Sequence, residues 1–522
     1  MEIRGKVSSR SWSRNCAIGS SMSEDHMESR RFVNLAAAAS PSPSLAQPIK
    51  AASKDSRIVE ENKKPGTVEW QLRYHTFDDP ISLASYPLNR RVRHSALEGY
   101  GSVTSALPGD TIDLMVSMKP PGSFLLDIYR MGYYGGTGAR HMLRLGPFPG
   151  GEQNVPMMSM ERLRECAWDR SAAIVIPKDW PSGVYLGKLT RDEPHGTQSY
   201  VIFVVKEHRS SDVLCQVSDL TWQAYNKWPG TNSLYDDGTP EIWYTGPHVR
   251  VSFDRPYAKY CQCVDSPLSS GSGGYILWEH PMTYWLEQQG YDVTYCSNVD
   301  LHVNPEVLKN SKVFLSVGHD EYWSKKMYQE VTKARDEGLS LAFLSGNTMW
   351  HEIEFYASSI TGSPARAFAR KVLMADTEKL MGVKARTIGY GDWVVTKPEH
   401  WVYEGTGLRS GDRIPAIIGW EYNGEPADIP GLEVLATSLL HPRTDQWVRE
   451  EHYHHGVIYP AGKGNWVFSA GTIWWADALS SPPGHITARV NEVAGTFGPQ
   501  PAAQRMTANV LNRMIKDSPV RG

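Results

Sequence analysis

The sequence predicts a doubly wound α/β domain preceded by an all-β sandwich, and two observations lead to this fold class. Residues 67–208 contain short alternating apolar and polar segments broken by Gly and Pro, which is typical of a sandwich. Residues 209–522 instead alternate short apolar runs with helical patterns. Strand, helix and strand at this spacing favour a right-handed parallel crossover.

Length and composition limit the classes of function. At 522 residues the chain is too long for one ordinary core. Its 54 basic and 57 acidic residues nearly balance, so nothing electrostatic points to nucleic acid or to an anionic membrane surface. The six cysteines form no C-x-x-C pair, so neither a zinc ribbon nor a disulfide framework is expected. No apolar run reaches the roughly 18 residues that a membrane-spanning helix needs.

The first 66 residues are rich in Ser, Ala, Pro and charged side chains, a composition that predicts no core of its own. Residues 29–39 are similar to a weak twin-arginine export signal, although Pro41 and Pro43 interrupt the apolar stretch that should follow. The sequence therefore predicts either a cytoplasmic protein or, if this signal acts, a periplasmic or exported one.

The sandwich predicted for residues 67–208 is of the immunoglobulin-like kind. Strands are expected at 111–117, 124–129 and 200–205, with turns at Pro-Gly pairs between them. The glycine-rich residues 131–138 are expected to form a hairpin turn, because no helix start follows them as a phosphate-binding loop requires.

The second part, residues 209–522, is expected to carry the parallel sheet. Its predicted elements are a helix at 278–289, a strand at 291–295, a strand at 313–317, a helix at 324–337 and a strand at 339–344. Further strands are expected at 416–421, 434–437, 456–459 and 466–469. A last helix at 503–515 has one apolar face, which indicates core packing.

The strand at 313–317 is the centre of the predicted site. It is followed by Gly318, His319, Asp320, Glu321 and Tyr322. Ligands of open parallel sheets bind beyond the carboxyl ends of the strands, so these polar side chains are expected to share one small volume. The alternative is structural: Asp320 or Glu321 caps the next helix, and His319 is a satisfied polar group.

The residue types favour metal-assisted hydrolysis over covalent catalysis. His319 and Glu321 stand two apart beyond a strand, where side chains point the same way, so one could bind a metal ion while the other transfers a proton. No G-x-S-x-G nucleophile elbow occurs, and no cysteine after a strand has a histidine beside it in sequence. The histidine tract 452–455 lacks a second ligand group at metal-binding spacing and is expected to be solvated or structural.

Several motifs of the second part are distinctive in combination. They are Trp-Gln-Ala-Tyr-Asn within 221–235, Phe-Asp-Arg-Pro-Tyr within 251–257, Gly-His-Asp-Glu-Tyr-Trp at 318–323 and Ser-Gly-Asn at 345–347. Together with residues 130–136 and 180–185 of the sandwich, they resemble the large chain of N,N-dimethylformamidase and the proteins that share its catalytic domain. The resemblance spans most of residues 95–480.

The resemblance implies one ferric ion held by two tyrosines and one glutamate. Matched by motif, Glu321 is the carboxylate ligand, and Tyr225 and Tyr257 are the phenolate ligands. Tyr235 and Tyr260 are close rivals, because loop lengths could shift the match. Phenolate and carboxylate oxygens are hard anionic donors that suit ferric iron and must lose their protons to bind it.

The resemblance also implies catalytic roles and a reaction. His319 would be a base or an orienting group, Asn347 a donor to the substrate carbonyl oxygen, and Glu421 a second acidic residue near the metal. The reaction would be hydrolysis of the C–N bond of a small amide or formamide. The expected partners are this substrate and either a small subunit or further copies of the chain, without nucleic acid.

Two other functions stay open. The second part could be a glutamine amidotransferase-like domain without the cysteine nucleophile, in a non-catalytic binding or assembly protein whose sandwich docks carbohydrate or another chain. Glu321 could instead pair with Asp320 or Glu421 in a carbohydrate-active hydrolase, which needs two carboxyl groups roughly 5 to 10 Å apart. Phenol oxygens that converge on Glu321 would count against the carboxylate pair.

Overall fold

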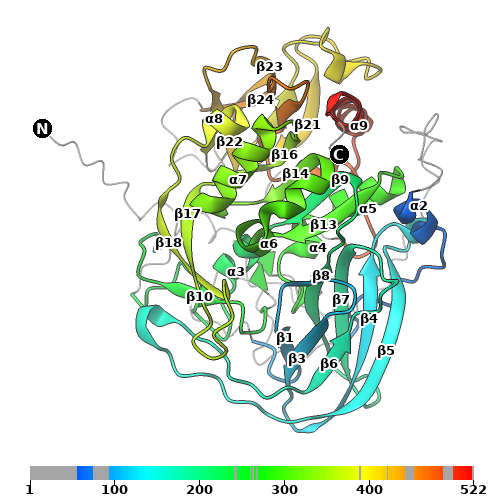
Figure 1. Cartoon of the computed structure of the whole chain (residues 1–522), viewed down its shortest axis with the longest axis vertical. Coiled ribbons are helices and arrows are strands. Elements are labelled where there is room, and N and C mark those ends of the chain that lie inside the picture. The colour runs from blue at the N-terminus through cyan, green and yellow to red at the C-terminus, as the bar shows by residue number, and fades with distance from the viewer. Residues whose placement is uncertain are drawn as a thin grey trace, which may run out of the picture.

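The computed structural model describes most of the chain (Figure 1). The described residues are 56–74, 93–239, 244–258, 260–261, 264–265, 269–386, 389–419, 421–440, 452–485 and 498–519. The stretch that is similar to an export signal, residues 29–39, lies outside them.

The amino-terminal part is a β-sandwich, as predicted (Figure 1). One sheet has the strand order β1–β3–β6 and the other has the order β2–β8–β7–β4–β5. Their bounds are β1 Glu98–Gly101, β2 Ser105–Ala106, β3 Thr111–Ser117, β4 Gly122–Met131, β5 Ala139–Gly150, β6 Ala172–Val175, β7 Gly183–Arg191 and β8 Gln198–Val205. Alternate side chains of β3 and β4, such as Leu114 and Leu126, pack in one apolar core between the sheets.

The glycine-rich residues 132–138 connect β4 to β5, and Met131 pairs with Ala139 across this connection. The predicted hairpin turn is therefore confirmed. Strand β8 ends at Val205 and the next strand, β9, begins at Ser211, on either side of the predicted domain boundary at 208/209.

The second part is built around a seven-stranded sheet with the order β13–β9–β14–β16–β25–β24–β23. The bounds are β9 Ser211–Val217, β13 Val293–Ser297, β14 Ser311–His319, β16 Ser340–Gly346, β23 Glu433–Leu440, β24 His452–Pro460 and β25 Trp466–Ser469. Strands β13, β9, β14, β16 and β25 run parallel, whereas β24 and β23 add an antiparallel edge. The sheet is therefore mixed.

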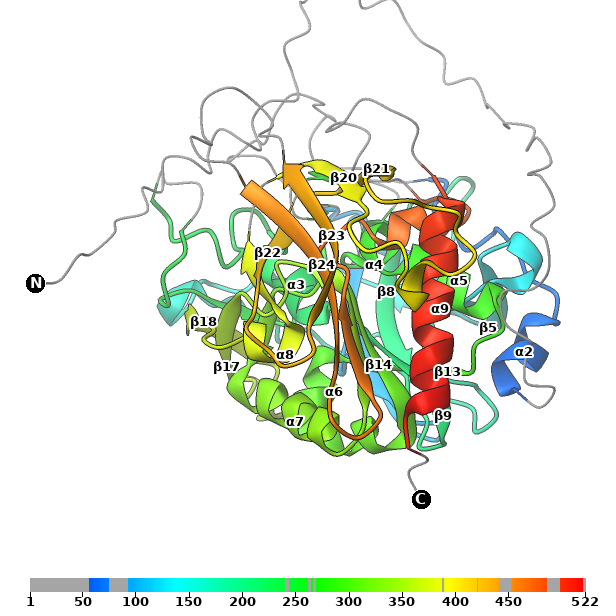
Figure 2. The same cartoon turned by 90° about the horizontal axis from the view of Figure 1, so that it is seen from above.

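Strand β14 is buried on both faces of this sheet. Val313, Leu315 and Val317 belong to an apolar core that includes Val510 of α9 (Pro501–Asp517). Phe314 belongs to a second core that includes Val331 of α7 (Lys325–Asp336). Figure 2 shows α9 and α7 on opposite sides of the sheet. Alternate side chains of β14 thus pack into two apolar cores, one on each face of the sheet.

The predicted fold class, a doubly wound α/β domain of the glutamine amidotransferase-like kind, is wrong. Among the described residues, strands account for 36% and helices for 21%, and the strands lie in many sheets, several of them mixed. The local elements predicted at 313–344 are present as β14, α7 and β16. The error came from extending that crossover to the rest of the chain. In later strands, side chains alternate between buried and exposed positions, which is typical of antiparallel pairing.

A four-stranded sheet with the order β10–β18–β17–β15 lies next to the carboxyl end of β14. Its bounds are β10 Arg250–Ser252, β15 Tyr322–Ser324, β17 His351–Tyr356 and β18 Ala367–Leu373. Because β15 begins three residues after β14 ends, the chain passes from one sheet directly into the other. This junction positions the candidate site.

Short helices and two-stranded sheets complete the second part. They are α3 Asp219–Tyr225, α4 Tyr275–Trp278, α5 His280–Gln288, α6 Asn298–Val303, α8 Glu378–Met381, β11 Tyr260–Cys261, β12 Val264–Asp265, β19 Val383–Arg386, β20 Gly391–Val394, β21 Arg413–Ile418 and β22 Tyr422–Pro426. The helix predicted at 278–289 is broken at Glu279 into α4 and α5. Among the described residues, no helix combines the length and the apolar character needed to cross a membrane.

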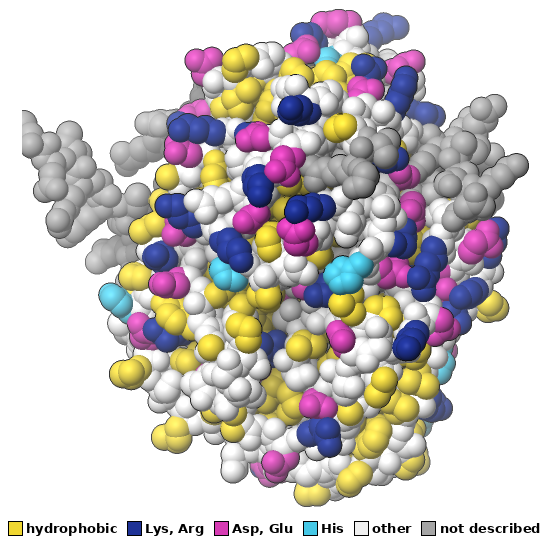
Figure 3. Space-filling model, in the orientation of Figure 1, with side chains coloured by type: hydrophobic (Ala, Val, Ile, Leu, Met, Phe, Trp, Pro, Cys, Tyr) yellow, Lys and Arg dark blue, Asp and Glu magenta, His cyan; other side chains and the backbone are white. Residues whose placement is uncertain are grey.

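The described end of the predicted tail is folded against the rest of the protein. Residues Arg57–Asn62 form α2, capped by Ser56, and Ile58 is buried in the same core as Trp70. On the face seen in Figure 3, Lys and Arg side chains are interspersed with Asp and Glu, in keeping with the formal net charge of −3.

Candidate metal centre

The candidate site begins where β14 leaves the central sheet. Gly318 has a φ of +67°, a left-handed conformation that glycine adopts without strain. A Cβ at this position would lie 2.8 Å from the Cβ of Trp278, so the close approach also requires glycine. The turn leads the chain from His319, the last residue of β14, through Asp320 and Glu321 into β15.

Asp320 anchors this turn. Its carboxylate accepts hydrogen bonds from Gln216 Nε2 at 2.6 Å, Ser316 Oγ at 2.8 Å and Asn298 Nδ2 at 3.0 Å. Its carbonyl oxygen accepts one from Met349 N at 3.0 Å. Burial raises the pKa of this carboxyl to about 6, although the side-chain donors oppose the rise. Asp320 thus stabilises the conformation of this loop.

The backbone of Glu321 is fixed on both sides. Its N–H donates to Thr221 Oγ1 of α3 at 3.0 Å, and its carbonyl oxygen accepts from His351 N of β17 at 3.0 Å. The residue retains only 2% of its accessible surface. The helix after β15 is capped by Ser324, whose Oγ accepts from Met327 N, so neither Asp320 nor Glu321 serves as that cap.

Tyrosine hydroxyls surround the carboxylate of Glu321. Tyr225 Oη, at the end of α3, donates to Glu321 Oε2 at 2.8 Å. Tyr235 Oη lies 3.2 Å from Glu321 Oε1 and 2.9 Å from Tyr225 Oη. Tyr322 Oη is in short contact with Tyr235 Oη. Three phenols and one carboxylate therefore meet in a buried volume.

The ionisation of this cluster is governed by burial. Burial raises the pKa of Glu321 to about 7; His319 opposes this rise and nearby Glu421 contributes to it. Burial and then the Glu321 carboxylate hold the pKa values of Tyr225 and Tyr235 well above the ordinary range. The phenols are therefore neutral hydrogen-bond donors to the carboxylate.

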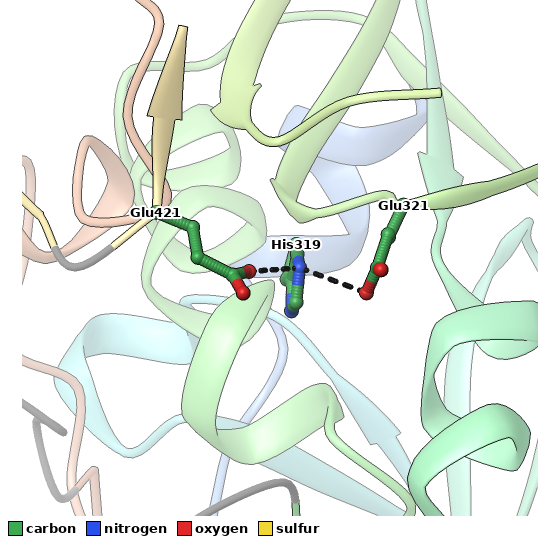
Figure 4. Close-up of side chains that lie close together, drawn as sticks. All are labelled: His319, Glu321 and Glu421. Atoms are coloured by element: carbon green, nitrogen blue, oxygen red, sulfur yellow. Dashed lines mark ion pairs between the residues drawn. The ribbon is translucent and has the colours of Figure 1, made fainter. Parts of the chain in front are cut away.

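His319 lies between two glutamates, as Figure 4 shows. Its Nε2 lies 3.3 Å from Glu321 Oε2 and forms a closer ion pair with Glu421 Oε2. Burial lowers the pKa of His319, but the Glu421 and Glu321 carboxylates outweigh burial and raise it above the ordinary value. Glu421 reaches this position because Gly346 has no Cβ: a Cβ there would lie 2.5 Å from the Glu421 carbonyl oxygen.

Asn347 follows β16 at the same edge of the sheet. His319 pairs with Gly346 across the parallel strands, so Asn347 leaves the sheet beside Asp320. Its φ of +50° is unusual for a residue with a side chain. Both polar side-chain atoms are buried and have no hydrogen-bond partner among the described residues. A buried amide in this state is available to a ligand.

Two further residues of the cluster were not predicted as site residues. Arg370 of β18 places its guanidinium 4.5 Å from the Tyr235 ring centroid, and its Nη2 donates to Leu234 O and Tyr244 O. His351 Nε2 lies 3.4 Å from Glu321 Oε1, and burial and Arg370 keep the pKa of His351 well below its ordinary value. Arg370 stands in no local motif, whereas His351 ends the polar stretch that begins at Ser345; the folding of β17 and β18 brings both residues here.

The structure places the sequence-predicted residues as follows. Tyr225, His319, Glu321 and Glu421 come together, and Tyr235, named as a rival, joins them. The Tyr257 ring instead packs edge-on against Trp222, with ring centroids 6.3 Å apart. The side chain of Tyr260 lies outside the described part of the structure.

The donor set fits a metal ion in two ways that share Glu321. One donor atom each from His319, Glu321 and Glu421 lies within 4.8 Å of the others, and all three residues are buried. The hydroxyls of Tyr225 and Tyr235 supply further oxygen donors at the same carboxylate. Hard oxygen donors suit ferric iron, and imidazole and carboxylate groups are also ligands of divalent iron and zinc.

Comparison with known proteins shows the family to which the chain belongs. No curated protein matches the chain. A family model described as N,N-dimethylformamidase beta subunit-like, C-terminal, matches residues 125–489, which include both the larger share of the sandwich and every residue of the centre. Because the match covers more than half of the chain, the protein belongs to the N,N-dimethylformamidase beta subunit-like family.

Proposed function

We propose that the protein is an iron-dependent hydrolase that cleaves the C–N bond of a small amide or formamide. One observation carries the proposal: Tyr225 and Tyr235 hydroxyls lie 2.8 and 3.2 Å from oxygens of the buried Glu321 carboxylate. Two phenols on one buried carboxylate become an anionic oxygen site when they lose their protons, and such a site suits a trivalent cation. Membership of the family supports the hydrolase class.

Tyr225, Tyr235 and Glu321 hold the ion in this proposal. Tyr235 replaces the expected Tyr257 as second phenolate, because Tyr235 contacts both Tyr225 and Glu321 whereas Tyr257 packs on Trp222. A bound ferric ion polarises a carbonyl oxygen and makes water more acidic.

The remaining side chains bind the substrate and transfer protons. The free amide N–H of Asn347 donates to the substrate carbonyl oxygen, because Nδ2 is buried with no other acceptor among the described residues. His319 accepts a proton, and Glu421, in ion-pair contact with Nε2, orients the imidazole and stabilises its charged form.

The reaction is balanced by one water molecule. The water oxygen bonds to the carbonyl carbon while His319 accepts a water proton. The C–N bond then breaks, and His319 donates that proton to the departing nitrogen. The products are a carboxylic acid and an amine.

The two alternatives receive less support from the same geometry. In a carbohydrate-active hydrolase the paired carboxyl groups stand across a sugar, whereas His319 lies between Glu321 and Glu421 and contacts both. Asp320, the other candidate partner, is fully hydrogen-bonded to three side chains. A purely binding role is less well supported because the family is described by a hydrolase, N,N-dimethylformamidase.

A partner chain belongs to the same proposal. The family description refers to a beta subunit, which supports a second, smaller chain as partner. The alternative is a homo-oligomer, and a mass measurement of the protein purified from its own source distinguishes the two.

The test uses two variants of neighbouring residues. Glu321→Ala removes the carboxylate that all candidate ligands share, so we expect loss of both bound iron and amide hydrolysis. His319→Ala removes the proton carrier alone, so we expect iron to stay bound while kcat falls by about 10²- to 10⁴-fold. Iron is measured by elemental analysis, and released amine is measured with a series of small amides.

A buried glutamate outside the centre provides the control. Glu165 accepts hydrogen bonds from Ser252 Oγ and Ser359 N, and Glu165→Ala should keep both iron and activity. Full activity in Glu321→Ala would contradict the proposed metal site. Wild-type protein that binds iron but hydrolyses no amide would contradict the proposed substrate class but not the proposed metal centre.

A further inference from the structure

The loop between the two phenols is unusually well braced. Tyr225 ends α3 and Tyr235 follows ten residues later, yet their ring centroids lie 4.8 Å apart. Leu234 N donates to Ala224 O at 2.9 Å and closes the loop one residue before each tyrosine. The spacing of the two hydroxyls therefore depends on the conformation of residues 226–234.

The interior of this loop is filled by a side chain from elsewhere, Arg255, which retains 1% of its accessible surface. Its guanidinium donates to the carbonyl oxygens of Trp228 at 3.0 Å, Asn232 at 2.8 Å and Asn226 at 3.0 Å. Its Nε donates to Gln223 Oε1 at 2.9 Å. One side chain thus binds both arms of the loop.

Every one of these acceptors is an uncharged oxygen. Two other buried arginines, in contrast, face carboxylates: Arg130 lies against Glu287, and Arg366 against Asp254. Burial accordingly lowers the pKa of Arg255 to about 10, because carbonyl dipoles compensate a buried charge less fully than a carboxylate does. A buried cation with such partners costs stability, which favours a role beyond general packing.

A second contact pair locks the base of the same loop. Lys227 Nζ donates to Asp236 Oδ2 at 2.9 Å, and Ser233 N donates to the same oxygen at 2.9 Å. Asn226 Oδ1 accepts from Trp228 N at 3.2 Å and from Ala258 N at 3.1 Å, which ties the loop to the segment that carries Arg255. The loop is therefore held by contacts within the protein itself.

We infer that Arg255 is a positioning residue that holds the loop between Tyr225 and Tyr235 so that their hydroxyls stand at metal-binding distance from Glu321 before the ion arrives. The inference rests on the proposed function for the identity of the ion. Preorganisation of this kind raises affinity because less ordering accompanies binding. Lysine cannot replace the guanidinium, since it has three donors on one nitrogen rather than five in a planar fork.

The experiment compares Arg255→Lys with Arg366→Lys. Arg366 is also buried and donates to Asp254, but it does not touch residues 226–234 in any described contact. In metal-free protein, hydrogen exchange of the peptide covering 224–235 should quicken about tenfold in Arg255→Lys and stay unchanged in Arg366→Lys. Iron affinity should fall about 10- to 100-fold only in Arg255→Lys, with a weaker phenolate-to-iron absorption band.

A milder variant covers the case in which Arg255→Lys does not fold. Gln223→Ala removes the Oε1 acceptor of Arg255 and keeps the arginine, so both effects should appear in the same direction and smaller. Unchanged loop exchange in these variants, or equal acceleration in Arg366→Lys, would overturn the inference. If wild-type protein takes up no iron, the proposed function fails, and the exchange data still decide whether Arg255 orders the loop.

Discussion

At the scale of single residues, the carboxylate of Glu321 explains why several tyrosines gather at one buried point. A buried carboxylate is costly without donors, and the hydroxyl of Tyr225 at 2.8 Å provides one. A cation that displaces the phenol protons would compensate the same carboxylate. The protonated tyrosines therefore stabilise the Glu321 carboxylate, and the same oxygens could bind a metal ion. Metal binding should then release the hydroxyl protons.

The choice between two tyrosines gives a direct prediction. Tyr235→Phe removes a hydroxyl that contacts both Glu321 and Tyr225, so we expect iron affinity to fall at least about tenfold. Tyr257→Phe should leave iron binding unchanged, since that ring packs on Trp222. Titration of metal-free protein with ferric iron, followed by visible absorption, measures both variants. The opposite result would identify Tyr257 as the ligand.

The sequence could indicate only part of this centre. Glu321 and His319 follow one strand, so local order alone places them together. The second phenol could not be chosen, because Tyr235 and Tyr257 both precede β14 and only the folded path of the intervening loops decides between them. Arg370 and His351 come from β18 and β17, which follow β16 in the chain. His351 lies close to the Ser-Gly-Asn motif at 345–347, whereas no motif lies near Arg370.

At the scale of elements, the end of β14 depends on a glycine. Gly318→Ala introduces a Cβ 2.8 Å from Trp278 Cβ at a φ of +67°. We expect a loss of about 1–3 kcal/mol in unfolding free energy from the backbone strain, together with a displaced His319 and a larger loss of kcat. Denaturant unfolding and amide hydrolysis are measured on the same preparation.

Gly362 provides the matched control for this change. Its φ is +72°, and a Cβ there meets no atom within 4 Å, so Gly362→Ala has the backbone strain without the contact. Gly362→Ala should lose some stability and keep full activity. Equal activity in the two variants would show that the Trp278 contact does not position His319.

The histidine tract on β24 gives a prediction about pH. His454 is buried, its Nε2 lies 2.8 Å from Ala470 O, and burial lowers its pKa from 6.5 to about 3. Between these values the unfolded chain binds a proton that the folded protein does not. The stability contributed by neutral His454 is thus complete above about pH 6.5 and is lost as the pH falls below it.

The variant His454→Phe keeps a ring beside Trp393 and removes this titration. Between about pH 7.5 and pH 5, wild-type protein should lose about 2 kcal/mol more unfolding free energy than the variant, at 1.36 kcal/mol for each pH unit below 6.5. Other titrating groups are shared and cancel in the difference. Urea unfolding measures both proteins at the two pH values. If wild type and variant lose the same unfolding free energy, His454 is not neutral and buried in the folded protein.

At the scale of the whole molecule, the sandwich was predictable and the class of the second part was not. Strand alternation and Pro-Gly turns are local signals, and β3, β4 and β8 lie where they indicated. The crossover β14–α7–β16 is also local. Which strands complete a sheet depends on pairing between distant segments: β23 pairs with β24 in antiparallel register, and no residue near either strand states that direction.

The two parts of the molecule meet at a buried ion pair. Arg130 of β4 donates from Nη2 to Glu287 Oε1 of α5 at 2.7 Å and from Nη1 to Glu287 Oε2 at 3.0 Å, and neither side chain is exposed. Tyr295 Oη and Asn62 Nδ2 also donate to Glu287, at 2.9 and 2.7 Å. Strand β4, helices α2 and α5 and strand β13 therefore converge on one carboxylate.

Removing one charge of this ion pair should destabilise the folded protein. Arg130→Met leaves Glu287 buried with only neutral donors, so we expect a loss of about 3–5 kcal/mol in unfolding free energy. The double variant Arg130→Met with Glu287→Leu removes both charges and should recover part of that loss, because no buried charge remains although Tyr295 Oη and Asn62 Nδ2 lose their acceptor. Denaturant unfolding of the single and double variants forms a thermodynamic cycle. Additive losses would mean that the two charges act independently and that other contacts hold the sandwich to the second part.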